Sequence, residues 1–251
     1  MTFNAIVTAD RLVDFLEPVS ALVDECKLHL GVDGLRIAAV DPANVAMVEA
    51  TLDAGGFESY ESDGGVIGLN LNAFEDVLAL ADSGDLVHLE LDEQVRKLDI
   101  RFGSVDYTQA LINPQSVRQE PDLPSIDWLA TAVATGKQLD QAVTAADLVD
   151  DHIQLVSDGP ERALATDADG DTDDVQVEYD RDDLVSASPG DGRVSSMFSL
   201  DYVSSIVGTM DADAEVTVRL ANEMPAELSW AHSEGQASAT VLISPRIAGG
   251  E

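Results

Sequence analysis

The densest run of potential metal ligands in this 251-residue sequence lies in residues 167–178. Four acidic residues occupy positions 1, 3, 5 and 12 of the EF-hand calcium loop: Asp167, Asp169, Asp171 and Glu178. Position 6 of that loop is a glycine because the backbone turns sharply there, and here it is Thr172. The flanking residues alternate as strands do. We therefore interpret the run as a solvated acidic loop and keep a calcium-dependent acidic enzyme as a minor alternative.

No other group of residues has the spacing of a catalytic or cofactor-binding motif. The sequence lacks glycine-rich phosphate loops, an H-E-x-x-H zinc motif and a G-x-S-x-G nucleophile motif. The four histidines are widely separated: His29, His88, His152 and His232. The single cysteine, Cys26, is predicted to be a small core residue of the first helix. The absence of such a motif favours a protein that is not an enzyme, and we therefore expect no catalytic residue, metal or cofactor.

Four segments repeat their apolar residues with the helical period. The first helix presents one apolar face: Leu12, Phe15, Leu16, Val19, Leu22, Val23 and Cys26. Thr8 and Asp10 are its N-cap candidates, and Pro18 should bend it. The other helices are predicted at residues 72–82, 136–150 and 200–210.

Most other segments alternate apolar and polar residues, which is typical of half-buried strands. Clear examples are Val87/Leu89/Leu91, Leu98/Ile100/Phe102, Val175/Val177/Tyr179 and Val216/Val218/Leu220. Strands outnumber helices and do not alternate with them one for one. The pattern predicts an α+β fold with antiparallel sheets and helices on one face.

The order of elements repeats in the two halves of the chain. Residues 22–25 (LVDE) recur as residues 148–151 (LVDD), and both tetrapeptides lead into an apolar strand. Between the halves, residues 113–125 contain three prolines and are predicted to form an extended linker. We therefore predict two similar domains, 1–112 and 126–251.

The charge balance is extreme, with 48 acidic against 13 basic residues and a net charge of −35. Because the Debye length is only about 3 Å at about 1 M salt, such a surface is tolerable in a salt-saturated cytoplasm. An acidic surface for a basic partner is the alternative. The lone cysteine and the absence of a signal-like or membrane-spanning run predict a soluble, cytoplasmic protein.

Several short motifs occur in the order found in one known family. Residues 40–48 (VDPANVAMV) form a strand, an Asp-containing turn and a second strand, followed by residues 56–60 (GFESY) and 68–71 (GLNL). Residues 224–228 (MPAEL) and 244–247 (SPRI) complete the series. Together these motifs resemble DNA sliding clamps of the proliferating cell nuclear antigen (PCNA) family, of an archaeal, halophilic type.

The resemblance implies a homotrimeric ring of six similar domains, with sheets outside and four helices per chain lining a hole around double-stranded DNA. It implies a processivity factor without catalytic activity. The implied partners are DNA polymerase, clamp loader, flap endonuclease and DNA ligase, each bound through a short peptide, with no membrane partner. A checkpoint-type or heterotrimeric clamp subunit is the alternative.

The same resemblance implies where these contacts lie. The peptide groove is expected at Val40, Asp41, Asn44, Val45, Leu123, Pro225, Leu242, Pro245 and Ile247. DNA is expected to face Arg11, Asp14, Asp76, Lys137, Gln141 and Thr144. Subunits are expected to pair through Tyr107, Gln109 and Leu111 with Val175, Val177 and Tyr179. Because related clamps line these helices with Lys and Arg, direct phosphate contact is in doubt here, and closure of the ring must hold the DNA.

Overall fold

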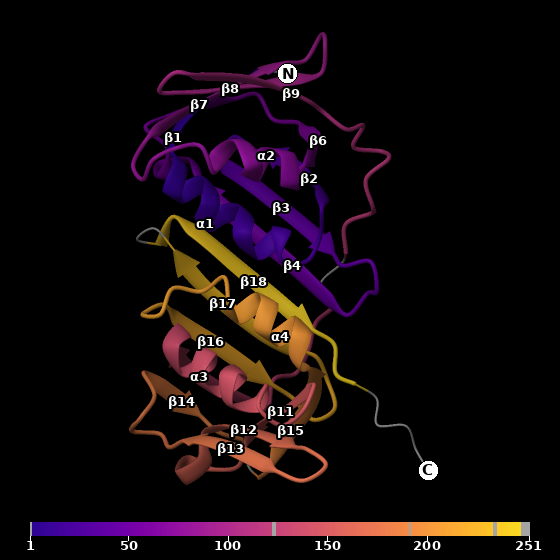
Figure 1. The fold of residues 1–251 in the computed structure, drawn as a ribbon, viewed down its shortest axis with the longest axis vertical. Coiled ribbons are helices and arrows are strands. Elements are labelled where there is room, and N and C mark those ends of the chain that lie inside the picture. The colour runs from indigo at the N-terminus through magenta and orange to yellow at the C-terminus, as the bar shows by residue number, and fades with distance from the viewer. Residues whose placement is uncertain (1, 122–123, 191, 233–234, 247–251) are drawn as a thin grey trace. The chain divides into compact units, whose positions relative to one another are not determined.

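The computed structural model describes residues 2–121, 124–190, 192–232 and 235–246, which form two compact units (Figure 1). The first unit comprises residues 1–42, 47–122 and 231–239, and the second comprises 43–46, 123–230 and 240–251. Each unit is therefore one half of the chain together with short segments from the other half. The sequence boundaries at 112 and 126 stay a prediction.

The first unit begins with a strand and a helix and continues mainly in strands. Its elements are β1 (Phe3–Thr8), α1 (Ala9–Ser20), β2 (Glu25–Leu30), β3 (Gly34–Val40), β4 (Ala46–Asp53), the short 3₁₀ turn η1 (Ala54–Gly56), β5 (Ser59–Ser62), β6 (Val66–Asn70), α2 (Leu71–Leu78), β7 (Leu86–Asp92), β8 (Lys97–Phe102) and β9 (Val105–Ala110).

The second unit repeats this order. Its elements are β10 (Ala130–Thr135), α3 (Gly136–Ala146), β11 (His152–Ser157), η2 (Pro160–Arg162), β12 (Leu164–Asp169), β13 (Asp174–Tyr179), β14 (Ser186–Ser188), β15 (Val194–Ser199), α4 (Leu200–Val207), β16 (Glu215–Leu220), β17 (Ala226–His232) and β18 (Ala237–Ile243). The internal repeat and the four strand examples predicted from alternation are confirmed.

Each unit contains two runs of antiparallel strands. In the first unit the strand orders are β5-β1-β7-β8-β9 and β4-β3-β2-β6. In the second unit the corresponding orders are β14-β10-β16-β17 and β13-β12-β11-β15. The predicted α+β class is confirmed, and β9 and β13 are both edge strands.

The two helices of each unit pack side by side and lie on the same face of its strands (Figure 1). Helix α1 buries Leu12, Phe15, Leu16 and Val19, and α2 buries Leu71, Phe74, Val77 and Leu78. Burying these apolar faces supplies the main stabilisation, at about 25 cal/mol per Å² of apolar surface. Pro18 does not break α1 because it lies in the last turn.

The prediction that Cys26 belongs to the first helix is wrong. Helix α1 ends at Ser20, and Cys26 lies in β2, where it is 1% exposed. Leu22 and Cys26 are four residues apart and both buried, so their spacing imitated a further helical turn. The other three helices begin within one residue of their predicted starts and end three to four residues earlier than predicted.

Local hydrogen bonds explain where two of the helices begin. Asn70 accepts from the backbone N–H of Ala73 at the start of α2, and Thr135 and Gln138 form a reciprocal capping box on α3. At α1, Thr8 is the N-cap residue but makes no side-chain cap, and Asp10 instead accepts from Ser83 and Gly84. Of the two cap candidates there, neither side chain therefore caps the helix.

Candidate functional site

The linker follows a fixed path across the outer face of β2, β3 and β6 in the first unit. Its start is hydrogen bonded to β6, where the backbone N–H of Ile112 donates to the carbonyl of Gly68 over 2.9 Å. A Cβ on Gly68 would lie 2.6 Å from the Ile112 carbonyl oxygen, so only glycine allows this approach. Further along, Val117 is buried and the Arg118 guanidinium donates to the Asp41 carbonyl over 2.9 Å.

A hollow of about 490 Å³ lies between this linker and the strands. Its walls are formed by residues 20–27, 38–40, Pro42 and linker residues 117–119. The lining of the hollow combines apolar residues, such as Ala38 and Val40, with charged ones, such as Lys27. A concave surface that combines apolar walls with a few charged groups suits an extended peptide.

Two carboxylates and two basic side chains clasp the linker to β2, β3 and β4. Glu120 accepts from the His29 ring over 2.5 Å and lies 3.8 Å from the Arg36 guanidinium. Arg36 also pairs with Glu49 over 2.8 Å. The hydrogen bond that Arg36 donates to Glu49 is the main reason why the pKa of Arg36 is raised, so the guanidinium stays charged. The linker is thus anchored by Glu120 as well as by Arg118.

Cys26 is a buried residue that contributes to the lining of the same hollow. Burial, followed by the negative charges of Glu120 and Glu25, raises the pKa of its thiol to about 12. Because the thiolate is the reactive form, Cys26 is an inert part of the wall at neutral pH.

The structure divides the predicted groove residues between the two units. In the first unit, Val40 lines the hollow and Asp41 is buried below Arg118. In the second unit, the N–H of Ser244 donates to the Val45 carbonyl over 2.7 Å, which places Val45 beside the Leu242–Pro245 segment.

The remaining groove residues are half-buried, exposed or not described. Pro225 is half-buried before β17, and Asn44 is exposed with a positive φ of 58°. Leu123 and Ile247 lie outside the described residues.

The predicted DNA-facing residues lie on three of the helices, α1, α2 and α3, and their role stays a prediction. Asp76, Lys137, Gln141 and Thr144 are exposed, whereas Arg11 and Asp14 are half-buried. Arg11 donates to the Gly56 carbonyl over 2.8 Å, so this cation already serves the fold. Among the described residues, Lys137 is then the one basic side chain of these helices with no hydrogen bond or ion pair.

All six predicted interface residues lie on or beside the edge strands β9 and β13, but one of them is buried. Tyr107 is 38% exposed on β9, and Leu111 directly follows that strand. Val175, Val177 and Tyr179 are half-buried on β13. Gln109, in contrast, is buried, and its amide donates to the Asn70 carbonyl over 2.8 Å. Gln109 therefore supports its own unit.

The acidic run at 167–178 is a β12–β13 hairpin rather than the helix-flanked loop of an EF-hand. Asp167 pairs with both Arg162 and Arg193, and Glu178 pairs with Arg162. Two of the four calcium-loop positions are therefore already neutralised by arginine, which removes the geometric basis of the calcium-dependent enzyme.

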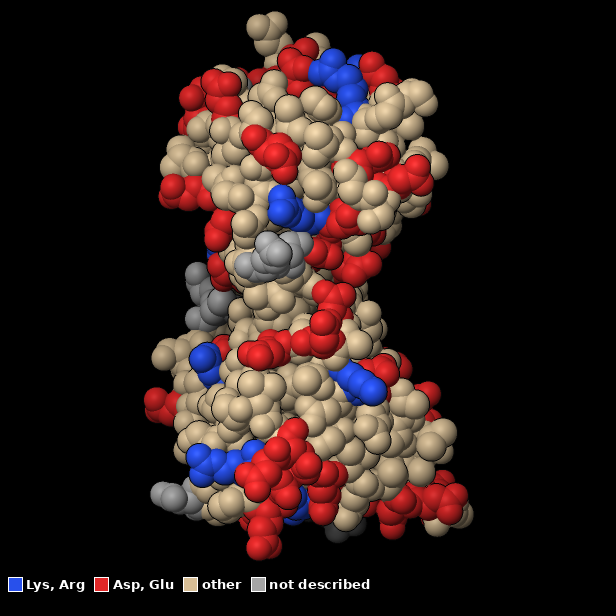
Figure 2. Space-filling model, turned by 90° about the vertical axis from the view of Figure 1, so that its left-hand side faces the viewer, with Lys and Arg blue, Asp and Glu red and all other residues tan. Residues whose placement is uncertain are grey.

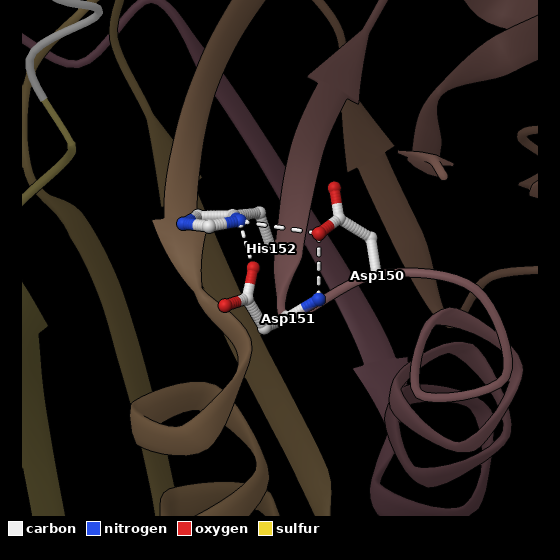
Figure 3. Close-up of side chains that lie close together, drawn as sticks. All are labelled: Asp150, Asp151 and His152. Carbon is white, nitrogen blue, oxygen red and sulfur yellow. Dashed lines mark hydrogen bonds and ion pairs between the residues drawn. The ribbon is translucent and has the colours of Figure 1, made fainter. Parts of the chain in front are cut away.

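A second group of possible metal ligands lies where the loop after α3 meets β11 (Figure 3). His152 directs its Nδ1 atom toward the carboxylates of Asp150 and Asp151. Burial opposes ionisation of Asp150, but hydrogen bonds with His152 and Asp151 outweigh it and lower the pKa of this carboxyl. The Arg246 guanidinium lies against the other ring nitrogen, and its positive charge would oppose a bound cation.

Charged side chains outside these sites are overwhelmingly acidic. Figure 2 shows carboxylates distributed over the visible face of both units, with only scattered lysine and arginine. Among the described residues, no helix is long and apolar enough to cross a bilayer.

Sequence reasoning missed the residues that hold the linker: His29, Arg36, Val117, Arg118 and Glu120. The alternation of Lys27 and His29 on β2 placed both on one strand face and was the available signal. Glu120 lies 91 residues from His29 along the chain. Such pairs are not visible in local sequence patterns.

The fold defines the class: a duplicated α+β protein with antiparallel sheets, whose edge strands include β9 and β13. Residues 3–112 match the family described as proliferating cell nuclear antigen, N-terminal domain. The DNA polymerase sliding clamps of Haloarcula marismortui and Natronomonas pharaonis are 53% and 52% identical, each over 98% of both chains. This chain belongs to the PCNA family of DNA polymerase sliding clamps.

Solved structures agree with that assignment. The PCNA of A. fulgidus, solved with the C-terminal region of FEN-1 bound, superimposes with a TM-score of 0.92 at 30% identity, covering 99% of this chain and 100% of that one. The PCNA of Thermococcus kodakaraensis gives a TM-score of 0.89 at 25% identity, covering 97% and 100%.

Proposed function

We propose that this chain is a non-catalytic sliding clamp that assembles as a homotrimer, encircles double-stranded DNA and tethers replication and repair proteins to it. The observation that carries the proposal is the duplicated fold with an edge strand in each unit, β9 in the first and β13 in the second, in a chain of the sliding-clamp family. The cytoplasm of a halophile is the setting that its net charge of −35 fits.

The two edges support closure of a ring. Strand β9 ends one sheet of the first unit and β13 begins one sheet of the second. An unpaired edge exposes a row of N–H and C=O groups that pair readily with another strand. Tyr107 on β9 and Val175 and Val177 on β13 would add apolar contacts to that pairing. Because the edges belong to different units, the pairing is head-to-tail and can close into a cycle.

Topology, rather than charge attraction, would then retain the DNA. Lys137 is the one uncommitted cation of the four described helices, which also expose Asp76. Lysine–phosphate contacts weaken steeply as salt rises, whereas linkage through a closed ring does not depend on them. In molar KCl the acidic surface is screened over about 3 Å, so the duplex can pass through the ring.

The hollow below the linker supports the docking role. The C-terminal region of FEN-1 binds the A. fulgidus relative, and a flap endonuclease peptide is accordingly the first expected partner here. DNA polymerase, DNA ligase and the clamp loader would use the same kind of short apolar-aromatic peptide. Binding that depends mainly on apolar burial persists at high salt.

The decisive experiment compares circular and linear DNA. Clamps assembled on nicked circular DNA by their loader should stay bound in molar KCl and leave when a restriction enzyme linearises the DNA. Equal retention on both forms would contradict topological binding. Val177→Lys on the β13 edge should prevent ring assembly, whereas Val32→Lys, at a valine that is 66% exposed and lies in neither edge strand, should not.

A further inference from the structure

Lys27 lies on the outer face of β2, in the wall of the hollow. On one side it pairs in register with Gly68 of β6. On the other side, the pairing of His29 with Arg36 places Ala38 across from it. Both neighbours are small, so the lysine side chain borders open space rather than packed side chains.

The charges around Lys27 leave it without an anion. His29 pairs with Glu120 over 2.5 Å, and Arg36 pairs with Glu49 over 2.8 Å. Lys27, in contrast, has no carboxylate oxygen within 4.0 Å among the residues that the structure describes. It is also half-buried, whereas Lys97 and Lys137 are exposed. A half-buried lysine without a counter-ion gains more from an incoming carboxylate than a fully exposed one does.

The corresponding position of the second unit is filled. There Gln154 of β11 pairs in register with Met197 of β15 and Asp167 of β12. Arg193 bridges the pair, donating to Gln154 over 3.2 Å and to Asp167 over 3.3 Å. The shared scaffold therefore does not itself create an unpaired cation in a hollow, and the residues around Lys27 do.

We propose that Lys27 is a specificity-determining residue of the docking groove, which pairs with the carboxylate of an Asp or Glu side chain on the docked peptide. This inference rests on the proposed docking function and adds the chemistry of the partner. The ion pair forms at contact distance inside a partly enclosed hollow, so molar salt screens it less than a surface pair.

Two acidic residues at the rim sharpen the selection by position. Asp24 and Glu25 line the same hollow and are exposed, and Asp24 accepts from the Asn72 amide over 3.2 Å. A carboxylate placed beside them is repelled, whereas one directed at Lys27 is attracted. Repulsion from Asp24 and Glu25 and attraction to Lys27 thus together favour one register of the peptide.

The test is a charge-swap cycle with a labelled peptide that copies the C-terminal region of FEN-1, the region that binds the A. fulgidus clamp. Each position flanking its apolar anchors is replaced in turn by Glu, Gln or Lys, and affinity is measured by fluorescence anisotropy in molar KCl. At one position, Glu should bind the wild-type clamp about five- to tenfold more tightly than Gln. Lys27→Ala should abolish that preference, Lys27→Arg should keep it, and Lys27→Glu should transfer it to the Lys peptide.

The control is Lys97→Glu, which makes the same charge change at an exposed residue of β8 outside the hollow and should leave every preference intact. Unchanged melting temperature and molar mass of each variant exclude misfolding. Equal preferences in wild type and Lys27→Ala, or tightest wild-type binding by a Lys peptide, would overturn the role of Lys27 alone. Failure of every peptide to bind the wild type would overturn the docking function, and the role of Lys27 with it.

Discussion

The two units share one order of elements but use the outer face of the β2 sheet and the β11 sheet in opposite ways. In the first unit, Gly68 and Ala38 flank Lys27 and a hollow remains below the linker. In the second unit, Met197 and Asp167 flank Gln154, and arginines fill the space. One duplicated scaffold has thus produced an open face with a hollow and a closed face held by ion pairs.

The chain segments that follow the two halves show a related difference. The linker N–H of Ile112 donates to Gly68 on β6, and the N–H of Arg246 donates to Met197 on β15. Both segments therefore attach to the equivalent edge strand. The glycine lets the linker approach closely and continue over the sheet, whereas Arg246 directs its charge onto His152. Small residues and the placement of scarce cations, rather than topology, separate the two faces.

The largest expected effect comes from opening the closed face. The Asp167 carboxylate is only 8% exposed and pairs with both Arg162 and Arg193. Asp167→Ala removes this shared partner and should lower the free energy of unfolding by about 3 kcal/mol. Urea denaturation in molar KCl measures this. Glu90→Ala is the matched control because it removes an exposed partner of Arg101, and it should cost under about 1 kcal/mol. Equal losses would show that the network of the second unit is not special.

Closing the open face should have the next largest effect. Gly68→Ala places a Cβ against the Ile112 carbonyl and should displace the start of the linker, at a cost of about 2 kcal/mol in stability. Peptide affinity should fall as well, which titration calorimetry measures. Gly55→Ala adds the same methyl group where no atom lies within 4 Å, and should be nearly neutral. Wild-type behaviour of Gly68→Ala would mean that the linker path is not fixed there.

A smaller effect is expected from loosening the clasp. Glu120→Gln removes the charge that faces His29 and Arg36 and should leave the linker mobile. Because a mobile linker must be ordered on binding, the binding free energy of the peptide should weaken by about 1 kcal/mol, which is roughly a fivefold loss of affinity. Anisotropy titration in parallel with the wild type checks this. If Glu120→Gln bound peptide as tightly as the wild type, the clasp would have no part in shaping the groove.

The subtlest effect is on the reactivity of Cys26. Because burial raises the pKa of its thiol to about 12, the protonated form dominates at pH 8 and labelling must wait for the wall to open. A thiol reagent should react slowly with the native clamp and severalfold faster with Glu120→Gln. Because the pKa of the thiol is raised in the folded protein, its contribution to the free energy of unfolding is fully present below pH 9 and is lost as the pH rises toward 12. Rapid labelling of the wild type would contradict a fixed linker.

Patterns along the chain predicted most of the fold. The period of two identified the strands, the period of 3.6 identified four helices, and the repeat identified two similar halves. Cys26 was misplaced because its spacing from Leu22 suits a helix, whereas pairing with β3 and β6 makes that segment a strand. Local patterns do not contain such tertiary pairing.

The candidate site was less accessible from the sequence. Val40 and Asp41 were predicted from a motif, but the clasp depends on pairs such as His29 with Glu120, which are 91 residues apart. Gln109 was predicted at the interface because it alternates with Tyr107 and Leu111, yet its amide turns inward to the Asn70 carbonyl. The acidic hairpin at 167–178 imitated a calcium loop until Arg162 and Arg193 were placed beside it.

The molar mass of the purified chain in molar KCl, measured by light scattering, tests the account most directly. Three 26.6 kDa chains closed through the β9 and β13 edges should give a species of about 80 kDa, and Val177→Lys should reduce it to the mass of one chain. A wild-type chain that stays at 26.6 kDa at every concentration tested would contradict the ring and the function derived from it.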